Sequence, residues 1–275
     1  MTEQLIMRRP APPITPETAG WRWLSYQSAP VHGEQRFATG EDEVCLVNLG
    51  GSLEATVDGR GYSLGERATP FDDLPRALYV PPGTDVVVTG NGWLARCAAR
   101  ASQDHAGDVR AIEPDGMRVE VRGAGNATRQ INHIIPPEFP AHRLLVVEVL
   151  TPAGNWSSFP PHKHERENLP VENDLEEVYA YRFAAPEAFG VQRLYSRDGS
   201  LDETWTVRDG DVVLVPRGYH PFCSAHGYDG YYLNALAAEA RSMAAEDDPD
   251  LAWTRGPWES MERDPRVPLT GKETP

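Results

Sequence analysis

The chain has 275 residues, of which 40% are hydrophobic and 24% are charged, as in globular proteins. Its formal net charge of −15 argues against nucleic acid and anionic membrane surfaces as partners, because both are bound through basic patches. No apolar run approaches the roughly 18 residues of a membrane helix, so no membrane partner is expected. The N-terminus lacks signal-peptide features and the three cysteines are widely spaced, which predicts a cytoplasmic location with reduced thiols.

Short apolar or alternating segments, closed by Gly, Pro, Asn or Asp, recur along the whole chain. In the first half they are 44–49, 53–57 and 85–89. In the second half they are 144–150, 178–183, 191–195, 204–207, 212–215 and 231–236. This pattern predicts an all-β chain of sandwich or barrel units. The best helical candidate, 236–246, is short.

A faint internal repeat predicts two similar units. Residues 79–85 and 214–220 share the form apolar pair, Pro, any residue, Gly, any residue, polar side chain. Asp85 occupies the position of His220, and the first half has no His-x-His motif that could act together with it. We therefore expect an N-terminal unit, 1–125, without a metal site and a C-terminal unit, 126–275, that carries one.

Two histidines in an extended segment and a third far downstream form the main site signal. His162 and His164 are two residues apart in Pro-Pro-His-Lys-His, so their side chains point to one face of a strand. His220 follows a predicted strand that ends in a Pro/Gly turn. Three imidazoles and a carboxylate make a transition-metal site. The other histidines are interpreted as surface or core residues, namely His32, His105, His133, His142 and His226.

Glu177 is the predicted carboxylate ligand. Reading 165–174 as an inserted loop places Glu177 at the beginning of the next strand, and strand parity puts Tyr179 and Tyr181 on the same face. Glu165 and Glu172 are the rival carboxylates.

These motifs resemble those of a known family. Gly210, Pro216, Gly218 and His220 are similar to the second motif of the cupins. The segments 151–164, 175–179, 189–195, 211–221 and 231–234 resemble the 5-deoxy-glucuronate isomerase family of myo-inositol catabolism. This resemblance implies a bicupin, in which two jelly-roll-type β-barrel or sandwich units carry few short helices.

The resemblance also implies a reaction and a cofactor. The reaction is the aldose–ketose isomerisation of 5-deoxy-glucuronate, a small anionic sugar acid, to 5-dehydro-2-deoxy-gluconate. A divalent metal held by His162, His164, Glu177 and His220 could stabilise the enediolate as a Lewis acid. Because no redox chemistry is required, zinc or manganese would serve, and iron is a further option.

Other groups must move the proton and hold the substrate. The candidates for the proton shuttle are Lys163, Glu165, Tyr179 and Tyr181, although parity turns Lys163 away from the metal. A guanidinium pairs with a carboxylate through two hydrogen bonds, and parity favours Arg193 over Arg182 for this contact. Gln192 and Tyr232 complete the candidate substrate contacts, although Tyr232 also suits barrel packing.

Two other functions use the same residues. A cupin dioxygenase would hold Fe(II) with the three histidines and the glutamate and would consume oxygen. A non-catalytic sugar-acid binding protein would bind its ligand without turnover. Cupins often pair through exposed strands, which is compatible with a homo-oligomer.

Overall fold

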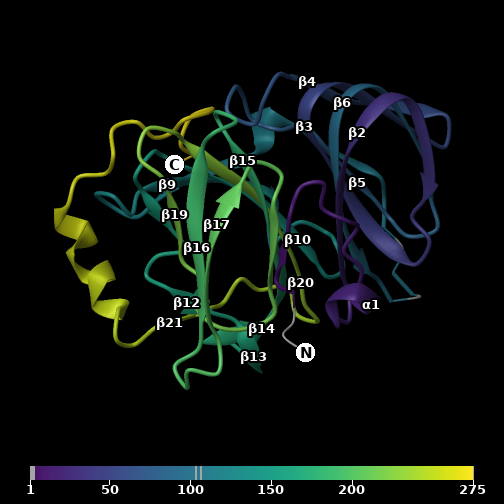
Figure 1. Ribbon diagram of the computed structural model, residues 1–275. Helices are drawn as coiled ribbons and strands as arrows, with labels where there is room; N and C mark the ends of the chain where they lie inside the picture. Colours follow the sequence, from purple (N-terminus) through teal and green to yellow (C-terminus); the bar gives the residue numbers. More distant parts are fainter. Residues whose placement is uncertain (1–3, 103, 106, 275) are drawn as a thin grey trace.

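The computed structural model describes residues 4–102, 104–105 and 107–274, which form three main β-sheets (Figure 1). Strands hold 51% of the residues and helices 6%, which confirms the predicted all-β class with few short helices. The helical segments are α1 (Pro16–Ala19), η1 (Pro114–Gly116) and η2 (Ala252–Ser260). No helix in the described ranges is both long enough and apolar enough to cross a bilayer.

The first sheet has the strand order β2-β6-β3-β5-β7, with β4 paired to β3. Its strands are β2 (Leu24–Ala38), β3 (Asp42–Val57), β4 (Arg60–Arg67), β5 (Ala77–Val80), β6 (Asp85–Arg100) and β7 (Arg110–Ile112). The sequence analysis ended strands at the glycines of 50–51 and 90–92. These expected ends are wrong, because β3 and β6 run through both segments. Gly51 pairs with Gly92, and a Cβ on Gly51 would lie 2.2 Å from the Asn91 carbonyl oxygen. Glycine here permits the close approach of the two paired backbones and does not end either strand.

The second sheet has the order β1-β18-β15-β20-β10-β9-β8. Its strands are β1 (Ile6–Met7), β8 (Arg118–Arg122), β9 (Arg129–Ile135), β10 (Leu144–Thr151), β15 (Glu176–Phe183), β18 (Val212–Val215) and β20 (Gly230–Ala237). The helix expected at 236–246 is wrong, because β20 continues to Ala237 between two partner strands. Hydrogen bonds on both sides outweigh the local helical preference. Because β1 and β8 also join this sheet, the sheets do not divide at residue 125.

A four-stranded sheet in the order β11-β19-β16-β17 packs against the second sheet. Its strands are β11 (Trp156–Ser157), β16 (Phe189–Tyr195), β17 (Asp202–Arg208) and β19 (Phe222–Ser224). Phe222 contacts Tyr181 and Tyr232, with ring centroids 5.0 and 5.7 Å apart. The remaining strands form two pairs, β12 (His162–Lys163) with β21 (Glu246–Asp247), and β13 (Glu165–Asn168) with β14 (Glu172–Asp174). The segment 165–174 is therefore a hairpin rather than the expected loop.

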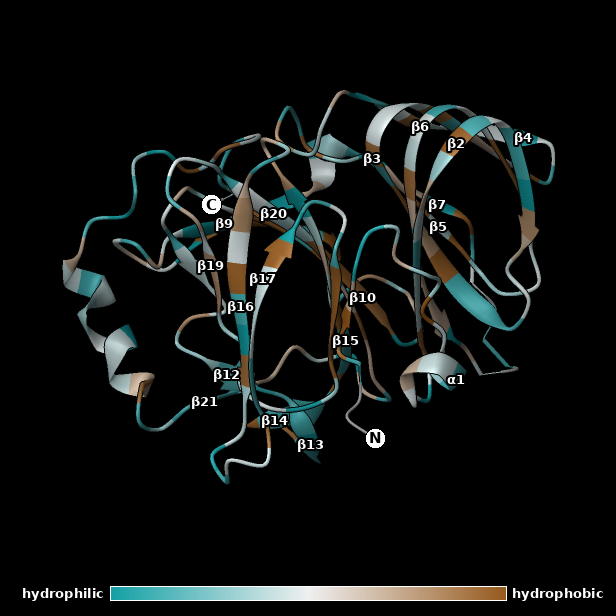
Figure 2. Cartoon of the chain, in the orientation of Figure 1, coloured by the Kyte–Doolittle hydropathy of each residue, from teal (hydrophilic) through white to brown (hydrophobic). Residues whose placement is uncertain are grey.

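One apolar cluster joins the two halves of the chain. It contains side chains of the first sheet, such as Tyr26 and Cys97, and of the second, such as Val147 and Leu233. A second cluster fills the first sheet. Hydrophobic residues lie along β5, β10 and β15, whereas the loops are largely hydrophilic (Figure 2). The halves therefore share a core instead of meeting at a polar surface.

Two buried carboxylates tie each half to a strand of the other. Glu43 on β3 accepts hydrogen bonds from the backbone N–H groups of residues 142–144, at 2.6 to 2.8 Å, and from the Tyr79 hydroxyl. Glu176 on β15 accepts hydrogen bonds from the backbone N–H groups of residues 22–24, where β2 begins. Each carboxylate thus accepts from three consecutive backbone N–H groups where a strand begins.

Replacing Glu43 with alanine should destabilise the fold, because it leaves buried N–H groups without acceptors. We expect Glu43→Ala to lower the free energy of unfolding by about 3 kcal/mol in urea denaturation followed by circular dichroism. Glu54→Ala changes an exposed glutamate of the same strand and should be neutral. Equal stability of the two variants would contradict the assigned role of Glu43.

Candidate functional site

The three predicted histidines come from an extended segment and a turn. His162 and Lys163 form β12, and His164 follows directly. Alternation sends Lys163 to the opposite side from the histidines, where its ammonium lies 2.8 Å from both oxygens of Glu172. His220 lies past the end of β18, in the turn that contains Gly218.

Glu177 and the histidines converge in the interior. The Nε2 atom of His164 lies 2.7 Å from Glu177 Oε2, and the Nε2 atom of His220 lies 3.4 Å from it. Metal ions are held by His, Cys, Asp and Glu side chains. Within the described ranges, one group of three or more of these is placed to share an ion, namely His164, Glu177 and His220. The ring of His162 packs 4.7 Å from that of His220, so this side chain borders the same point.

A backbone contact orients the imidazole of His220. The Nδ1 atom of His220 lies 2.9 Å from the Gly218 carbonyl oxygen, which can only accept, so Nδ1 carries the proton and Nε2 has a free lone pair. This Nε2 is buried and makes no hydrogen bond. Gly218 has φ 87°, and a Cβ there would lie 2.7 Å from the Tyr195 carbonyl oxygen. An oriented, buried and unpartnered imidazole nitrogen fits a metal ligand.

Burial and the pairing of His164 with Glu177 together set the pKa values of the ligand set. It lowers the pKa values of His162 and His220 to about 3, so both rings are neutral near pH 7 and can donate lone pairs. Burial alone would lower the pKa of His164 and raise that of Glu177. The attraction between these two groups outweighs burial, raising the pKa of His164 and lowering that of Glu177. The donor set of three imidazoles and a carboxylate therefore suits a first-row divalent metal.

A cavity of about 220 Å³ lies at this cluster. Of the residues predicted from sequence, its wall contains His162, His164, Glu177, Tyr179 and Tyr232. The hydroxyl of Tyr179 lies 2.8 Å from Ser158 Oγ, and that of Tyr232 donates to Ser157 Oγ at 3.1 Å. Ser158 has φ 50°, a left-handed conformation that is strained for a residue with a side chain. Strain of this kind concentrates at functional sites.

Several predicted residues lie outside this cavity. Glu165 accepts from the Gly218 N–H at 2.9 Å and supports the turn that carries His220. Tyr181 donates to the side chain of Gln192, and the Gln192 amide donates to the His220 carbonyl at 2.8 Å. Lys163, Glu165, Tyr181 and Gln192 therefore surround and support the ligands without lining the cavity.

Neither arginine predicted to hold the substrate lies in the cavity wall. Arg193 is half exposed on the β16–β17 hairpin and makes two hydrogen bonds to Asp202, at 2.8 and 3.0 Å. Arg182 points to the first sheet, where it lies over the Trp93 ring and near Asp209. The expectation for Arg193 is thus corrected, because parity within a strand does not tell which sheet faces the cavity.

The cavity wall also contains polar residues that sequence reasoning missed, namely Arg122, Arg129, His133, Asp247 and Arg255. Arg129, Ile131 and His133 occupy every second position of β9, so their side chains lie on one face of the strand. The pairing of β9 with β10, which brings this face to the metal ligands, has no local sequence signal.

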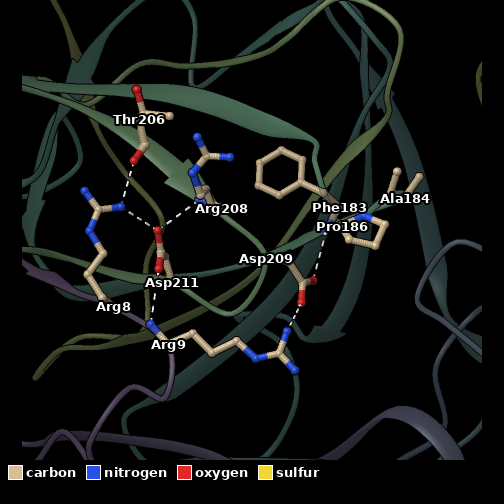
Figure 3. A pocket seen from close by; sticks show the side chains of 10 residues that line it. Arg8, Arg9, Phe183, Ala184, Pro186, Thr206, Arg208, Asp209 and Asp211 are labelled. Atoms are coloured by element: carbon tan, nitrogen blue, oxygen red, sulfur yellow. Dashed lines mark hydrogen bonds and ion pairs between the residues drawn. The ribbon is translucent and has the colours of Figure 1, made fainter.

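A larger pocket of about 740 Å³ lies elsewhere, around the turn between β17 and β18 (Figure 3). Arg8 donates to Asp211 at 2.6 Å, and Arg9 is paired with Asp209. The guanidinium groups of Arg8 and Arg9 therefore already have carboxylate partners.

Comparison with known proteins identifies the family. The KduI/IolB family matches residues 6–254. The chain belongs to the KduI/IolB family. A 5-deoxy-glucuronate isomerase from Geobacillus thermodenitrificans (strain NG80-2) is 43% identical to it over 246 residues, which cover 87% of this chain and 89% of that protein. The family predicted from the histidine segments is confirmed, and so is the isomerase class.

Solved structures agree with this assignment. An IolB-like protein from Salmonella typhimurium LT2 is 37% identical and superposes with a TM-score of 0.85, covering 89% of this chain and 94% of that one. An oxalate decarboxylase from Bacillus subtilis is 11% identical with a TM-score of 0.56, covering 86% of this chain and 74% of that one. The second likeness shows the cupin-like fold alone.

The geometry of this KduI/IolB member predicts the effect of removing one ligand. We expect His220→Ala to weaken zinc binding by more than about 100-fold, because a ligand should cost more than an outer-shell partner. Zinc titration against a competing chelator measures this change. His226→Ala, which changes an exposed histidine, should bind zinc as the unchanged protein does. Stoichiometric tight zinc in the His220 variant would show that the cluster is not the metal site.

Proposed function

We propose that this chain is a metal-dependent 5-deoxy-glucuronate isomerase that forms 5-dehydro-2-deoxy-gluconate. The observation that carries the proposal is the buried set of His164, Glu177 and His220 beside His162, in a chain 43% identical to a protein of that name. A cavity of about 220 Å³ suits a small molecule rather than a macromolecule. Zinc or manganese serves the reaction, since no electron leaves or enters the substrate.

The metal ligands in this proposal are His162, His164, Glu177 and His220. When bound, the divalent ion supplies Lewis-acid stabilisation of charge on the substrate oxygens. The hydrogen bond from His220 Nδ1 to Gly218 keeps its imidazole oriented before any substrate arrives. Apolar side chains complete the wall and reduce access of water, which strengthens the electrostatic contacts inside, and they include Ile131, Val147, Val149, Leu175 and Leu236.

Tyr179 is the proton-donating group in this proposal. Of the four shuttle candidates it alone lines the cavity. Burial raises the pKa of Tyr179 well above its usual range, and the Glu177 carboxylate adds to this shift. The phenol therefore stays protonated near pH 7. It can donate its proton or a hydrogen bond to the substrate oxygen on which charge builds, with Ser158 as its partner.

The natural ligand in this proposal is a small anionic sugar acid. A homo-oligomer and a cytoplasmic location stay predictions of the sequence.

The function is tested by incubating the zinc- or manganese-loaded protein with 5-deoxy-glucuronate in D₂O. Proton NMR should show the keto acid, with deuterium at the hydroxymethyl carbon beside the new ketone where the proton exchanges with solvent. A chelator should abolish turnover, and restored metal should recover it. Absence of the keto acid from the metal-loaded protein would overturn the assignment. Oxygen uptake with iron would indicate the dioxygenase instead, and chelator-insensitive binding without turnover would indicate a binding protein.

The role of Tyr179 is tested by removing its hydroxyl. We expect Tyr179→Phe to lower kcat by about 100-fold or more, with unchanged metal content. Tyr181→Phe is the matched control, because Tyr181 is buried on the same face of β15 but lies outside the cavity, and its rate should change only a few-fold. Equal rates for the two variants would exclude Tyr179 as the proton-donating group.

A further inference from the structure

The cavity contains one guanidinium whose charge has no partner. Arg129 is 4% exposed and lines the cavity, yet within the described part of the chain it forms no ion pair. Its Nη1 donates to the backbone carbonyls of Ala127 and Phe159, at 3.0 and 3.1 Å. Among the described residues, its Nε and Nη2 make no hydrogen bond. A buried cation in this state is costly unless an anion joins it.

Two neighbouring arginines show which kind of group the Nε and Nη2 edge of a guanidinium binds in this cavity. Arg122 uses Nε and Nη2 to bind both oxygens of Glu120, at 2.6 and 3.0 Å. Arg255 uses the same two atoms on Asp247, at 2.9 and 2.8 Å. This side of a guanidinium matches the two oxygens of a carboxylate. Arg129 presents the same edge with no carboxylate of the described chain on it.

The surroundings of Arg129 add to its demand for an anion. Arg122 is its direct partner across β8 and β9, and like charges in such a pair repel each other. Burial, together with Arg122, lowers the pKa of Arg129 to about 10, which still leaves it charged near pH 7. The ring of Trp258 on η2 lies 5.8 Å from the Arg129 guanidinium carbon and 5.1 Å from that of Arg255. An anion at this point would relieve the repulsion.

Arg129 acts on the same site as the metal ligands. It shares the cavity wall with His162, His164 and Glu177. We propose that Arg129 binds the carboxylate of the sugar-acid substrate through Nε and Nη2, and so selects sugar acids over neutral sugars. This inference rests on the proposed isomerase function and names the contact that recognises the acid group.

The test compares Arg129→Met with Arg193→Met, because Arg193 makes the same two-bond contact to Asp202 outside the cavity. With 5-deoxy-glucuronate, Arg129→Met should lower kcat/KM by roughly 100-fold, whereas Arg193→Met should stay within about threefold of the unchanged protein. With the analogue that has a hydroxymethyl group in place of the carboxylate, all three proteins should react at similar rates. An unchanged preference for the acid in Arg129→Met would overturn the proposal.

A binding measurement separates this proposal from the proposed function. In calorimetric titrations, the unchanged protein should bind D-glucuronate at least about tenfold more tightly than D-glucose, and Arg129→Met should abolish the difference. If the protein shows this behaviour without isomerising 5-deoxy-glucuronate, the isomerase assignment fails and the carboxylate contact stands. If it isomerises the substrate but Arg129→Met keeps the preference, the contact fails and the isomerase assignment stands.

Because Arg129 also holds the Phe159 carbonyl, a structural effect must be separated from loss of the contact. Metal content is measured for each variant by mass spectrometry. Arg129→Lys keeps a cation and a donor but loses the two-bond edge, so it should retain the metal and recover only part of the acid preference. Loss of preference in step with loss of metal in both variants would overturn direct binding by Arg129.

Discussion

The alternation of side chains along β15 is the constraint on which the site depends. Glu176 points to the first sheet and accepts three backbone N–H groups where β2 begins. Glu177, the next residue, points into the opposite layer and meets His164 and His220. β15 lies between β18 and β20, so hydrogen bonds on both sides hold its register. A shift of one residue would exchange the two carboxylates and destroy both arrangements.

The electrostatics of the cavity follow from burial and from the contact between His164 and Glu177. Removing imidazoles from water keeps His162 and His220 neutral, while the carboxylate of Glu177 stays charged because His164 lies beside it. Nearby arginines carry their own carboxylates, except for Arg129. These charges support the two proposals, a metal cation at one group of side chains and the substrate carboxylate at Arg129. A sugar acid combines an oxygen-rich end and a carboxylate end in one molecule.

The parts of the site that sequence predicted are those with short-range spacing. His162 and His164 are two residues apart, and His220 follows a Pro-x-Gly turn, so each has a local pattern. Glu177 required strand parity across the segment 165–174, which turned out to be a hairpin. Arg193 was misplaced because a strand has two faces, and its own residues do not reveal which layer covers either face.

Two levels of information thus meet in this protein. Turn residues and alternating segments by themselves determined the all-β class, and short-range spacing determined the candidate histidine ligands, because these depend on patterns within a few residues. The family came from the resemblance of whole motif segments. Only the tertiary structure decided that β3 and β6 run through their glycines, that β9 brings Arg129 to the cavity, and that Arg193 lies outside it. These outcomes depend on pairings between segments that are far apart in the chain, and the free energy of such pairings comes from burial and hydrogen bonds that no local pattern records.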